Sequence, residues 1–460
     1  MTPPAHRRRW PFVVPAVVLA LVVAAGGAAY GLGWVDHWRG TDVPPVPKRP
    51  ELSMTPLTPG AGGVAEPHLT GRPKAEAVRR ALAGPLADKH LGRHVLAEVA
   101  PLSGDPVLTH GSGVVTPASI TKLLTSTAAL AKLGPEHRFT TTVTRSGNRL
   151  TLVGGGDPLL TSADLAALAA ETARSLRTAG IGRVRLVVDA TLFTGPSVDP
   201  RWKASYLPDE VVAPISALTV DEAHTAGYDG EVFTGDDGRE RQPAVEAGQV
   251  FAAKLRAAGV SVSGRPTKGS RQGGTIATLR SERLSKIVEH TLELSDNEAA
   301  EILARQVGRA YGDASFTGAV AGVKQTLAGL GVDTSDITLY DGSGLSRQDR
   351  LSPGVVTAVL QTAASQDHPE LAAVISGLPV AGFNGSLDER FEKSPGGDGY
   401  VRAKTGTLTG VSGLAGIVTD RRGTPMVVVV MADRIKEPDT LDARAALDDA
   451  LASIATCTCS

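Results

Sequence analysis

Hydrophobic positions after about residue 75 follow two different periods, one typical of strands and the other typical of helices. Short apolar or alternating segments predict strands, and apolar residues that recur every three to four positions predict helices with one buried face. The predicted strands are 95–100, 149–153, 184–188, 401–407 and 426–431, and the clearest predicted helices are 117–134, 165–176, 284–294, 298–311 and 441–454. This mixture predicts an α/β (α+β) fold in which a sheet is flanked by helices.

Two of these elements carry further information. Residues 426–431 are a continuous apolar run, as expected for a strand that is buried on both faces. The helix 117–134 begins at Pro117 and ends at Gly134, which is the usual punctuation of a helix. Its apolar positions recur at helical spacing, so we expect it to be a buried helix.

The N-terminal segment 11–34 carries no charged residue and follows Arg7, Arg8 and Arg9. As a helix it is long enough to cross a bilayer with a hydrocarbon core of about 30 Å. The basic flank predicts a cytoplasmic N-terminus and export of everything that follows. The alternative is a signal peptide cleaved before Tyr30. Both alternatives predict an extracytoplasmic protein of the cell envelope, either membrane-anchored or secreted.

Residues 35–74 are rich in proline and show no hydrophobic periodicity, which predicts an extended linker. Hydrophobic residues make up 42% of the chain, enough for a sizeable core, and the net charge is −1. Without a basic surplus, nucleic acid is not an expected partner. The two cysteines, Cys457 and Cys459, exclude a disulfide framework, and we expect them to lie in a solvated tail.

The first of three short motifs is Ser119-Ile120-Thr121-Lys122. Residues three apart on a helix lie on one face, so Ser119 and Lys122 can touch. A serine hydroxyl becomes a good nucleophile when a base removes its proton, and lysine serves as that base when burial and a second cation lower its pKa. The N–H of Ser119, in the first helical turn, is a candidate oxyanion donor. The motif therefore predicts a nucleophile and its base, although a surface lysine fits the pattern when it is taken alone.

The second motif, Ser295-Asp296-Asn297, falls between two predicted helices. Ser295 can relay a proton between Lys122 and a leaving nitrogen, and Asn297 offers a donor and an acceptor for a substrate amide. Taken alone, the motif equally suits a helix-capping loop, where these residue types are favoured.

The third motif is Lys404-Thr405-Gly406, followed by Thr407, on a predicted strand. The side chains of Thr405 and Thr407 share one face of the strand. Together with Lys404 they are suited to binding a carboxylate. Gly406 allows close approach of a substrate backbone, and the N–H of Thr407 is a candidate for the second oxyanion donor. A lysine on a strand edge that discourages aggregation is the structural alternative.

These three motifs, in this order, are the signature of class A β-lactamases and penicillin-binding proteins. The sequence further resembles the D-alanyl-D-alanine carboxypeptidase/endopeptidase family of the penicillin-binding protein 4 type, a low-molecular-mass class C serine DD-peptidase. The resemblance covers roughly residues 75–454. It rests on the nucleophile segment 117–122, on Asp341-Gly342-Ser343-Gly344-Leu345-Ser346-Arg347, and on the segments 156–158 and 378–390. Asp349 departs from the family pattern, which more often has asparagine after the Ser-Arg.

The resemblance implies a β-lactamase/transpeptidase-like catalytic domain with accessory material inserted between the first two motifs, although the insertion is short for the family. The predicted divisions are 1–10 as a cytoplasmic basic tail, 11–34 as a transmembrane anchor or signal peptide, 35–74 as the linker, 75–138 and 271–460 as the two parts of the catalytic domain, and 139–270 as the inserted accessory domain.

The resemblance also implies the activity. By this resemblance, Ser119 is expected to form an acyl-enzyme with peptidoglycan stem peptides that end in D-Ala-D-Ala, and β-lactam antibiotics are expected to acylate the same serine. We expect Ser119, Lys122, Ser295 and Lys404 as catalytic residues, with Lys122 as the base either alone or sharing this role with Ser295. We expect Asn297, Thr405, Gly406 and Thr407 as substrate-binding residues. The sequence favours neither a carboxypeptidase nor an endopeptidase over the other.

Two other functions share the motifs. A class A β-lactamase needs a glutamate, usually in Glu-x-x-x-Asn. The only asparagine after Asn297 is Asn384, and Val380, not a glutamate, stands four residues before it. The motif is absent, so fast β-lactam hydrolysis is not expected. A membrane-tethered penicillin-binding module without turnover is the non-enzymatic alternative. We expect no cofactor and no metal, because His90 and His94 lack the glutamate of His-Glu-x-x-His.

Overall fold

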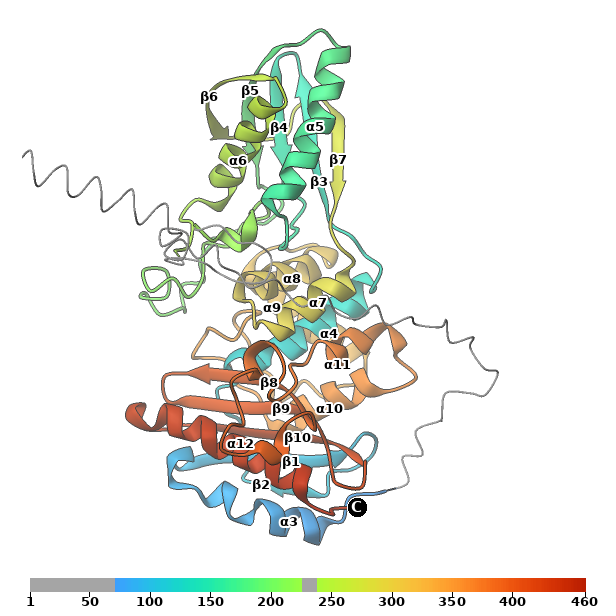
Figure 1. Cartoon of the computed structure of the whole chain (residues 1–460), viewed down its shortest axis with the longest axis vertical. Helices are drawn as coiled ribbons and strands as arrows, with labels where there is room; N and C mark the ends of the chain where they lie inside the picture. Colours follow the sequence, from blue (N-terminus) through green and yellow to red (C-terminus); the bar gives the residue numbers. More distant parts are fainter. Residues whose placement is uncertain (1–70, 226–237) are drawn as a thin grey trace, which may run out of the picture. The chain divides into compact units, whose positions relative to one another are not determined.

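Two five-stranded sheets organise the part of the chain that the structure, a computed structural model, describes: residues 71–225 and 238–460 (Figure 1). The first sheet has the strand order β2-β1-β10-β9-β8, and each neighbouring pair is antiparallel. Its strands are β1 (His94–Pro101), β2 (Leu108–His110), β8 (Val401–Leu408), β9 (Val411–Thr419) and β10 (Pro425–Asp433). Strand β8 therefore lies at one edge of this sheet.

Strand β10 lies at the centre of the first sheet and serves two hydrophobic cores. Because side chains alternate along a strand, Met426 and Val428 face one core while Val427 and Val429 face the other. All four side chains are fully buried, so the prediction of a strand buried on both faces is confirmed.

Helices cover both faces of the first sheet, as predicted for this α/β fold. One core includes residues of α3 (Ala75–Ala83) and α12 (Thr440–Thr456). The other core includes residues of α4 (Thr121–Leu133), α7 (Leu284–Glu293), α8 (Asn297–Ala310), α9 (Phe316–Gly329), α10 (Pro353–Ala364) and α11 (Ala372–Ser376).

The second sheet has the order β6-β5-β4-β3-β7 and is formed by the chain between α4 and α7. Strands β4, β5 and β6 are parallel to one another, while β3 is antiparallel to both of its neighbours. The elements are β3 (Thr140–Ser146), β4 (Arg149–Val153), α5 (Ser162–Thr178), β5 (Arg183–Asp189), α6 (Pro243–Ala257), β6 (Ser261–Lys268) and β7 (Gly274–Arg280). The predicted boundary at residue 270 falls before β7, so this sheet extends ten residues further. Its role as an accessory domain stays a prediction.

The C-terminal tail differs from the prediction. Cys457 and Cys459 form a disulfide, and Cys459 is fully buried. The carbonyl of Cys459 accepts the N–H of Lys74 at 2.6 Å, and the N–H of Ser460 donates to Asp420 at 3.1 Å. The prediction of a solvated tail is therefore wrong, because the last residues pack into the core that α3 and α12 share.

The N-terminal predictions concern residues that the structure does not describe. The basic tail 1–10, the apolar segment 11–34 and the linker up to residue 70 lie outside the described residues. Between residues 71 and 225 and from 238 onward, no helix has both the length and the apolar character that a bilayer crossing requires. The membrane anchor stays a prediction.

Candidate active site

Ser119 lies in a short 3-10 turn, η3 (Ala118–Ile120), which leads directly into α4. The residue before it, Ala118, has a φ of 48°, a left-handed value that is uncommon for a residue with a Cβ atom. Strain of this kind persists where the surrounding structure imposes it, and it is frequent at active sites. The side chain of Ser119 is partly exposed, whereas both of its chain neighbours are buried.

Two glycines allow other backbone segments to approach this turn closely. A Cβ atom on Gly344, where φ is 84°, would overlap the carbonyl oxygen of Ala118. A Cβ atom on Gly406 would lie 2.6 Å from the carbonyl oxygen of Pro117. The turn that carries Ser119 is therefore held between the loop around Gly344 and strand β8.

Lys122, one helical turn after Ser119, is fully buried and connects the first motif to the second motif and to the loop around Ser343. Its Nζ donates to Ser119 Oγ at 2.9 Å, to Asn297 Oδ1 at 2.8 Å and to the carbonyl oxygen of Ser343 at 2.9 Å. An ammonium group has three N–H donors, so these three partners use all of them.

This set of partners determines what Lys122 can do when it is neutral. A neutral amine keeps two hydrogens and gains a lone pair. The carbonyl of Ser343 and the Oδ1 atom of Asn297 can only accept, so they hold the two hydrogens. The lone pair then faces the hydroxyl of Ser119, the one partner that has a proton to give. The geometry therefore suits transfer of a proton from Ser119 to Lys122.

The pKa values of the two motif lysines support this chemistry. Burial lowers the pKa of Lys122 from its usual range to about 8, although the carboxylates of Asp296 and Asp341 partly oppose the effect. Burial also lowers the pKa of Lys404 well below its usual range, and the charge of Lys122 lowers it further. The second cation therefore acts mainly on Lys404, whereas burial suffices to lower the pKa of Lys122.

Ser295 and Asp296 of the second motif lie in the connection between α7 and α8, as predicted, whereas Asn297 is already the first residue of α8. Ser295 has a φ of 61°, a second left-handed residue beside the reaction site. Asp296 caps α8 by accepting the N–H of Ala299 at 3.0 Å. Asn297 Nδ2 donates to the carbonyl of Val211 at 2.9 Å, so its side chain is held on both sides. In this structure Ser295 is not one of the three partners of Lys122 Nζ.

The third motif lies on the edge strand β8 and pairs only with β9 within the described sheet. Lys404 is fully buried and its Nζ donates to the carbonyl of Thr405 at 3.0 Å. Thr405 is partly exposed and Thr407 is exposed, so both hydroxyls can reach a ligand. The bridge between Val380 and Arg402 covers the start of this edge, so the backbone groups available to an extended peptide lie further along β8, at the motif.

A layer of residues behind the motifs holds Ser343 beneath Lys122, and the motif analysis did not assign these residues a role. Glu301 accepts the N–H groups of Gly342 and Ser343 at 3.0 and 2.7 Å, while Thr125 donates to the carbonyl of Gly342 at 2.7 Å. Burial and the charge of Asp341 raise the pKa of Glu301 to about 8. Glu301 lies four residues after Asn297, so the two share one face of the helix. This spacing was the sequence signal that could have placed Glu301 near the site.

Asp341 organises the same loop from within. It accepts the N–H groups of Gly344 and Ser346 at 2.7 and 2.6 Å and the indole N–H of Trp202 at 2.7 Å. Asp349, the departure from the family pattern, is fully buried beside it and accepts the N–H of Tyr340 at 2.9 Å. Burial, and secondly the negative charge of Asp341, raise the pKa of Asp349 well above its ordinary value.

We predict that Asp349→Asn stabilises the protein at neutral pH. In the folded state the raised pKa keeps the Asp349 carboxyl protonated at pH values where the unfolded chain would ionise it. This carboxyl therefore lowers the free energy of unfolding progressively as pH rises above about 3.9, until pH passes the raised pKa. Asparagine is neutral and nearly isosteric. Urea unfolding at about pH 8 should give a free energy higher than wild type by at least about 1 kcal/mol, with a smaller difference at about pH 5. The exposed Asp336→Asn is the control, and an equal gain at both pH values would contradict the prediction.

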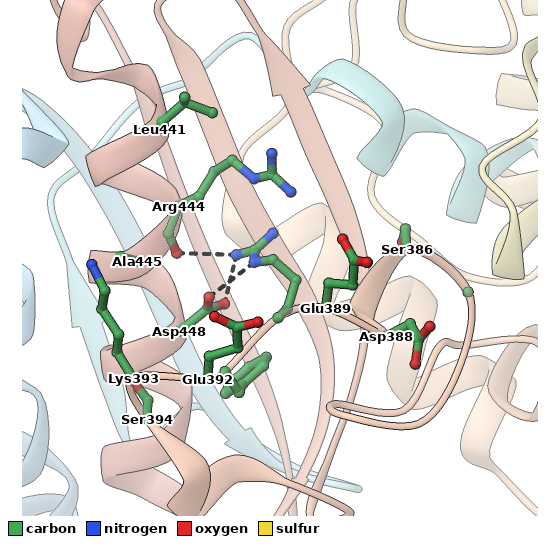
Figure 2. A pocket seen from close by; sticks show the side chains of 13 residues that line it. Ser386, Asp388, Glu389, Glu392, Lys393, Ser394, Leu441, Arg444, Ala445 and Asp448 are labelled. Atoms are coloured by element: carbon green, nitrogen blue, oxygen red, sulfur yellow. Dashed lines mark hydrogen bonds and ion pairs between the residues drawn. The ribbon is translucent and has the colours of Figure 1, made fainter.

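A pocket of about 590 Å³ lies beside the third motif, between residues 385–394 and α12 (Figure 2). Within it, Arg390 donates to Asp448 at 2.9 Å and to the carbonyl of Arg444 at 3.0 Å. Ser386 connects this pocket to the motif by a hydroxyl contact of 3.0 Å with Thr405. None of its lining residues belongs to the three motifs. The contacts of the buried Lys122 with Ser119 and Asn297, and not cavity volume, therefore identify the candidate active site.

Comparison with known proteins agrees with this geometry. The sequence matches the D-Ala-D-Ala carboxypeptidase 3 (S13) family over residues 78–228 and 237–454. It is 34% identical to carboxypeptidase DacB of Mycolicibacterium smegmatis over 479 aligned positions, which cover 100% of both chains. It is 31% identical to the D-alanyl-D-alanine carboxypeptidase of Actinomadura sp. over 396 positions, which cover 68% of this chain and 72% of that one.

The fold is similar to that of penicillin-binding protein 4 from Haemophilus influenzae. The crystal structure of that protein superposes with a TM-score of 0.67 at 22% identity and covers 82% of this chain and 97% of that one. The predicted resemblance, fold class and D-Ala-D-Ala carboxypeptidase activity are thereby confirmed. Because the family matches most of the length of this chain, the chain belongs to the D-Ala-D-Ala carboxypeptidase 3 (S13) family.

Proposed function

We propose that Ser119 of this serine-type carboxypeptidase attacks the carbonyl carbon of the D-Ala-D-Ala peptide bond in a peptidoglycan stem peptide. Lys122 takes the proton from Ser119 Oγ as the new C–O bond forms. When the C–N bond breaks, the proton passes to the leaving amine of the terminal D-alanine, with Ser295 as the relay. Water then hydrolyses the acyl-enzyme and restores Ser119.

The observation that carries this proposal is the contact set of Lys122. A buried amine with a pKa of about 8 lies 2.9 Å from Ser119 Oγ, and its other two partners can only accept hydrogen bonds. A surface lysine with a structural role would show neither the burial nor this pairing.

The edge strand β8 supplies the proposed substrate-binding groups. Lys404, Thr405 and Thr407 hold the terminal carboxylate, and Gly406 lets the peptide backbone approach. The carboxylate provides the countercharge that the buried Lys404 site lacks, which favours the charged ammonium when substrate is bound. Asn297 Nδ2 has a second hydrogen beyond the one donated to Val211, and this hydrogen binds the substrate amide carbonyl.

The proposed oxyanion hole consists of two backbone N–H groups, those of Ser119 and Thr407. One comes from the η3 turn and the other from β8, and the close approach of Gly406 to Pro117 brings these two segments together. Two fixed donors of this kind stabilise the negative charge that develops on the carbonyl oxygen during attack.

The test is covalent labelling with benzylpenicillin. Intact-mass measurement should show one added penicilloyl group, and peptide mapping should place it on Ser119. A parallel assay should show release of free D-alanine from a peptide ending in D-Ala-D-Ala. An adduct on another residue would contradict the assignment of the nucleophile, while labelling without D-alanine release would favour the binding module over the enzyme.

We predict that acylation by benzylpenicillin accelerates with pH. Lys122 acts as a base only when it is neutral, and its pKa is about 8, so its neutral fraction rises as pH rises through that value. The acylation rate constant should increase about tenfold per pH unit below the pKa and level off above it. A fluorescent penicillin and quenched time points from about pH 6 to about pH 10 measure this. Circular dichroism over the same range is the control for folding, and a flat profile would contradict the role of Lys122.

We further propose that the enzyme acts in the cell envelope and that residues 11–34 anchor it to the membrane. The uncharged segment and its preceding arginines support the anchor. Intact-mass measurement of the protein from the membrane fraction of the producing cell should give the chain with this segment retained. A mature N-terminus at Tyr30 would show instead that the segment is a cleaved signal peptide.

A further inference from the structure

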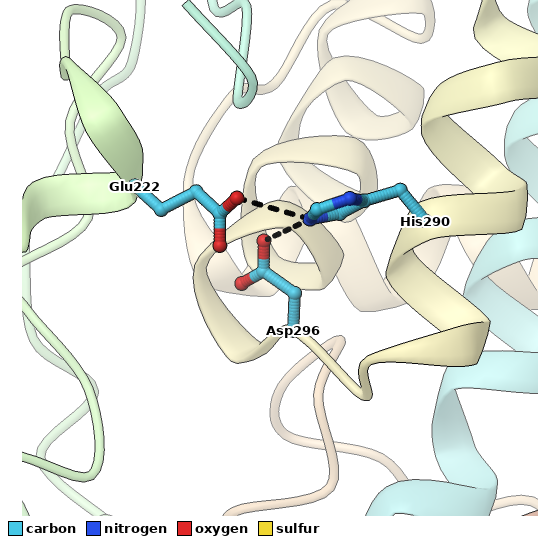
Figure 3. Close-up of side chains that lie close together, drawn as sticks. All are labelled: Glu222, His290 and Asp296. Atoms are coloured by element: carbon cyan, nitrogen blue, oxygen red, sulfur yellow. Dashed lines mark ion pairs between the residues drawn. The ribbon is translucent and has the colours of Figure 1, made fainter. Parts of the chain in front are cut away.

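Three side chains with metal-ligating atoms meet at the second motif, and none of them takes part in the proposed reaction (Figure 3). His290 comes from the last turn of α7, Asp296 from the loop that precedes α8, and Glu222 from η4 (Asp221–Ala223). Their ligand atoms all lie within 4.8 Å of one another. His290 Nε2 is 3.0 Å from Glu222 Oε1 and 3.8 Å from Asp296 Oδ2.

The cluster is enclosed and contains a buried carboxylate oxygen that accepts no hydrogen bond within the described part of the chain. The side chain of Asp296 is only 4% exposed, and that of Glu222 is 7% exposed. Asp296 Oδ1 caps α8, but Oδ2 has no hydrogen-bond donor among the described residues and points toward His290. Leaving such an oxygen unsatisfied is costly, so a buried carboxylate oxygen in this position calls for a partner.

An ion pair with His290 alone does not satisfy this oxygen. The Nε2 atom of an imidazole carries at most one hydrogen, and the shorter contact directs it to Glu222. The distance to Asp296 Oδ2, 3.8 Å, exceeds hydrogen-bond length. Arg239 also approaches this region, but its side chain bonds the backbone carbonyl of Glu222 and lies 3.4 Å from Glu298.

We propose that Glu222, His290 and Asp296 form a structural site for a divalent transition metal of the zinc type. Zinc binds imidazole nitrogen and carboxylate oxygen at about 2.0–2.2 Å, so the ligands of a tetrahedral site lie roughly 3.3 Å apart. The observed separations of 3.0 and 3.8 Å bracket this value. Two carboxylates and a neutral imidazole also balance the charge of the ion, and water completes the tetrahedron.

The site would join the chain segment before residue 225 to the second motif. Glu222 is presented by three consecutive left-handed residues, with φ values of 47°, 53° and 60° at Asp221, Glu222 and Ala223. Asp296 stands between Ser295 and Asn297. A metal that holds Asp296 would therefore fix the loop that carries the proposed proton relay and the substrate amide contact.

Sequence patterns could not reveal this site. The three ligands come from positions 222, 290 and 296, and neither His-Glu-x-x-His nor any other short spacing connects them. The proposed site departs from the sequence-based expectation of no metal, and it contacts none of the atoms proposed to react.

Zinc binding to the full chain tests the proposal. After treatment with a chelator and dialysis, titration with Zn²⁺ alone, followed by calorimetry and elemental analysis, should show one equivalent bound. Zinc in excess should raise the melting temperature by about 3 °C. His290→Gln and Glu222→Gln should each abolish the bound equivalent and the shift. His368→Gln is the matched control, because it removes the histidine of a surface pair in which Nδ1 lies 3.0 Å from Glu370, and it should bind zinc like the wild type.

Two results would overturn the proposal: no zinc bound by the wild type, or wild-type binding by His290→Gln and Glu222→Gln. A Cys457→Ser/Cys459→Ser variant should retain zinc binding, and loss of binding there would also overturn the proposal, by assigning the metal to tail cysteines whose disulfide had been reduced. If one of the two site variants fails to fold, the other is tested with Co²⁺, whose visible absorption reports binding at the site. Because zinc-free protein should still form the benzylpenicillin adduct, failure of the metal site is distinguishable from failure of the proposed reaction.

Discussion

Replacing Ser119 with alanine is expected to abolish the covalent benzylpenicillin adduct and to lower carboxypeptidase kcat/KM by at least about 10⁴-fold. The hydroxyl is the only group of this side chain that can bond to the substrate carbonyl, so alanine leaves binding and the proposed oxyanion donors but no acyl-enzyme. Intact mass with and without benzylpenicillin, and the rate of D-alanine release, measure the two effects.

A control is available in α4, the helix that directly follows the turn carrying Ser119. Ser126 lies in α4, is fully buried, and its hydroxyl has no hydrogen-bond partner among the described residues. Ser126→Ala therefore also removes a serine hydroxyl, but without removing a hydrogen bond, and the variant should be acylated at the wild-type rate. An adduct that persists in Ser119→Ala would refute the assignment of the nucleophile.

Replacing Lys122 with methionine is expected to slow acylation by about 10³-fold while leaving the protein folded. Methionine matches the length of lysine but cannot take a proton. Ser119 Oγ, Asn297 Oδ1 and the carbonyl of Ser343 would each lose their shared donor. The rate constant for acylation by a fluorescent penicillin measures the loss, and thermal melting reports on folding.

A second substitution separates the base from its charge. In Lys122→Arg the positive charge remains, but a guanidinium does not lose its proton at accessible pH. If Lys122 acts as the base, this variant should be as slow as Lys122→Met, and its residual rate should not rise with pH. Lys132→Met is the control, because Lys132 lies on the same helix over the ring of Tyr311, away from the three motifs. Wild-type acylation by Lys122→Arg would show that charge, and not proton transfer, is what the site requires.

Elements with strong periodicity were predicted well because one local signal decides each of them. The strand predicted at 149–153 is β4, and the helix predicted at 298–311 is α8, displaced by one residue at each end. Strand β9 was not predicted, because Gly413 and Gly416 interrupt its apolar pattern. In the folded sheet these glycines are required. A Cβ atom on Gly413 would lie 2.8 Å from the side chain of Ile120, and one on Gly416 would overlap the carbonyl oxygen of Arg402.

The three motifs were recognisable because short spacings carry their chemistry. The spacing of Ser119 and Lys122 predicts their contact, since residues three apart share one helical face. The layer behind them was not predictable in this way. Glu301, Asp341 and the carbonyl of Ser343 act through contacts between segments that are far apart in the sequence. The depressed pKa of Lys122 likewise depends on burial, which several separate elements create together.

Local patterns alone determined the α/β class, the order of the three motifs, the family resemblance and the pairing of Ser119 with Lys122. Each of these depends on residues within a few positions of one another, where helical or strand geometry fixes which side chains are neighbours. The tertiary structure alone decided the contacts of Lys122 with Asn297 and Ser343, the burial of the Cys457–Cys459 tail and the meeting of Glu222 with His290 and Asp296. Those contacts join segments separated by tens to hundreds of residues, and only the packing of the folded chain brings such segments within hydrogen-bond distance.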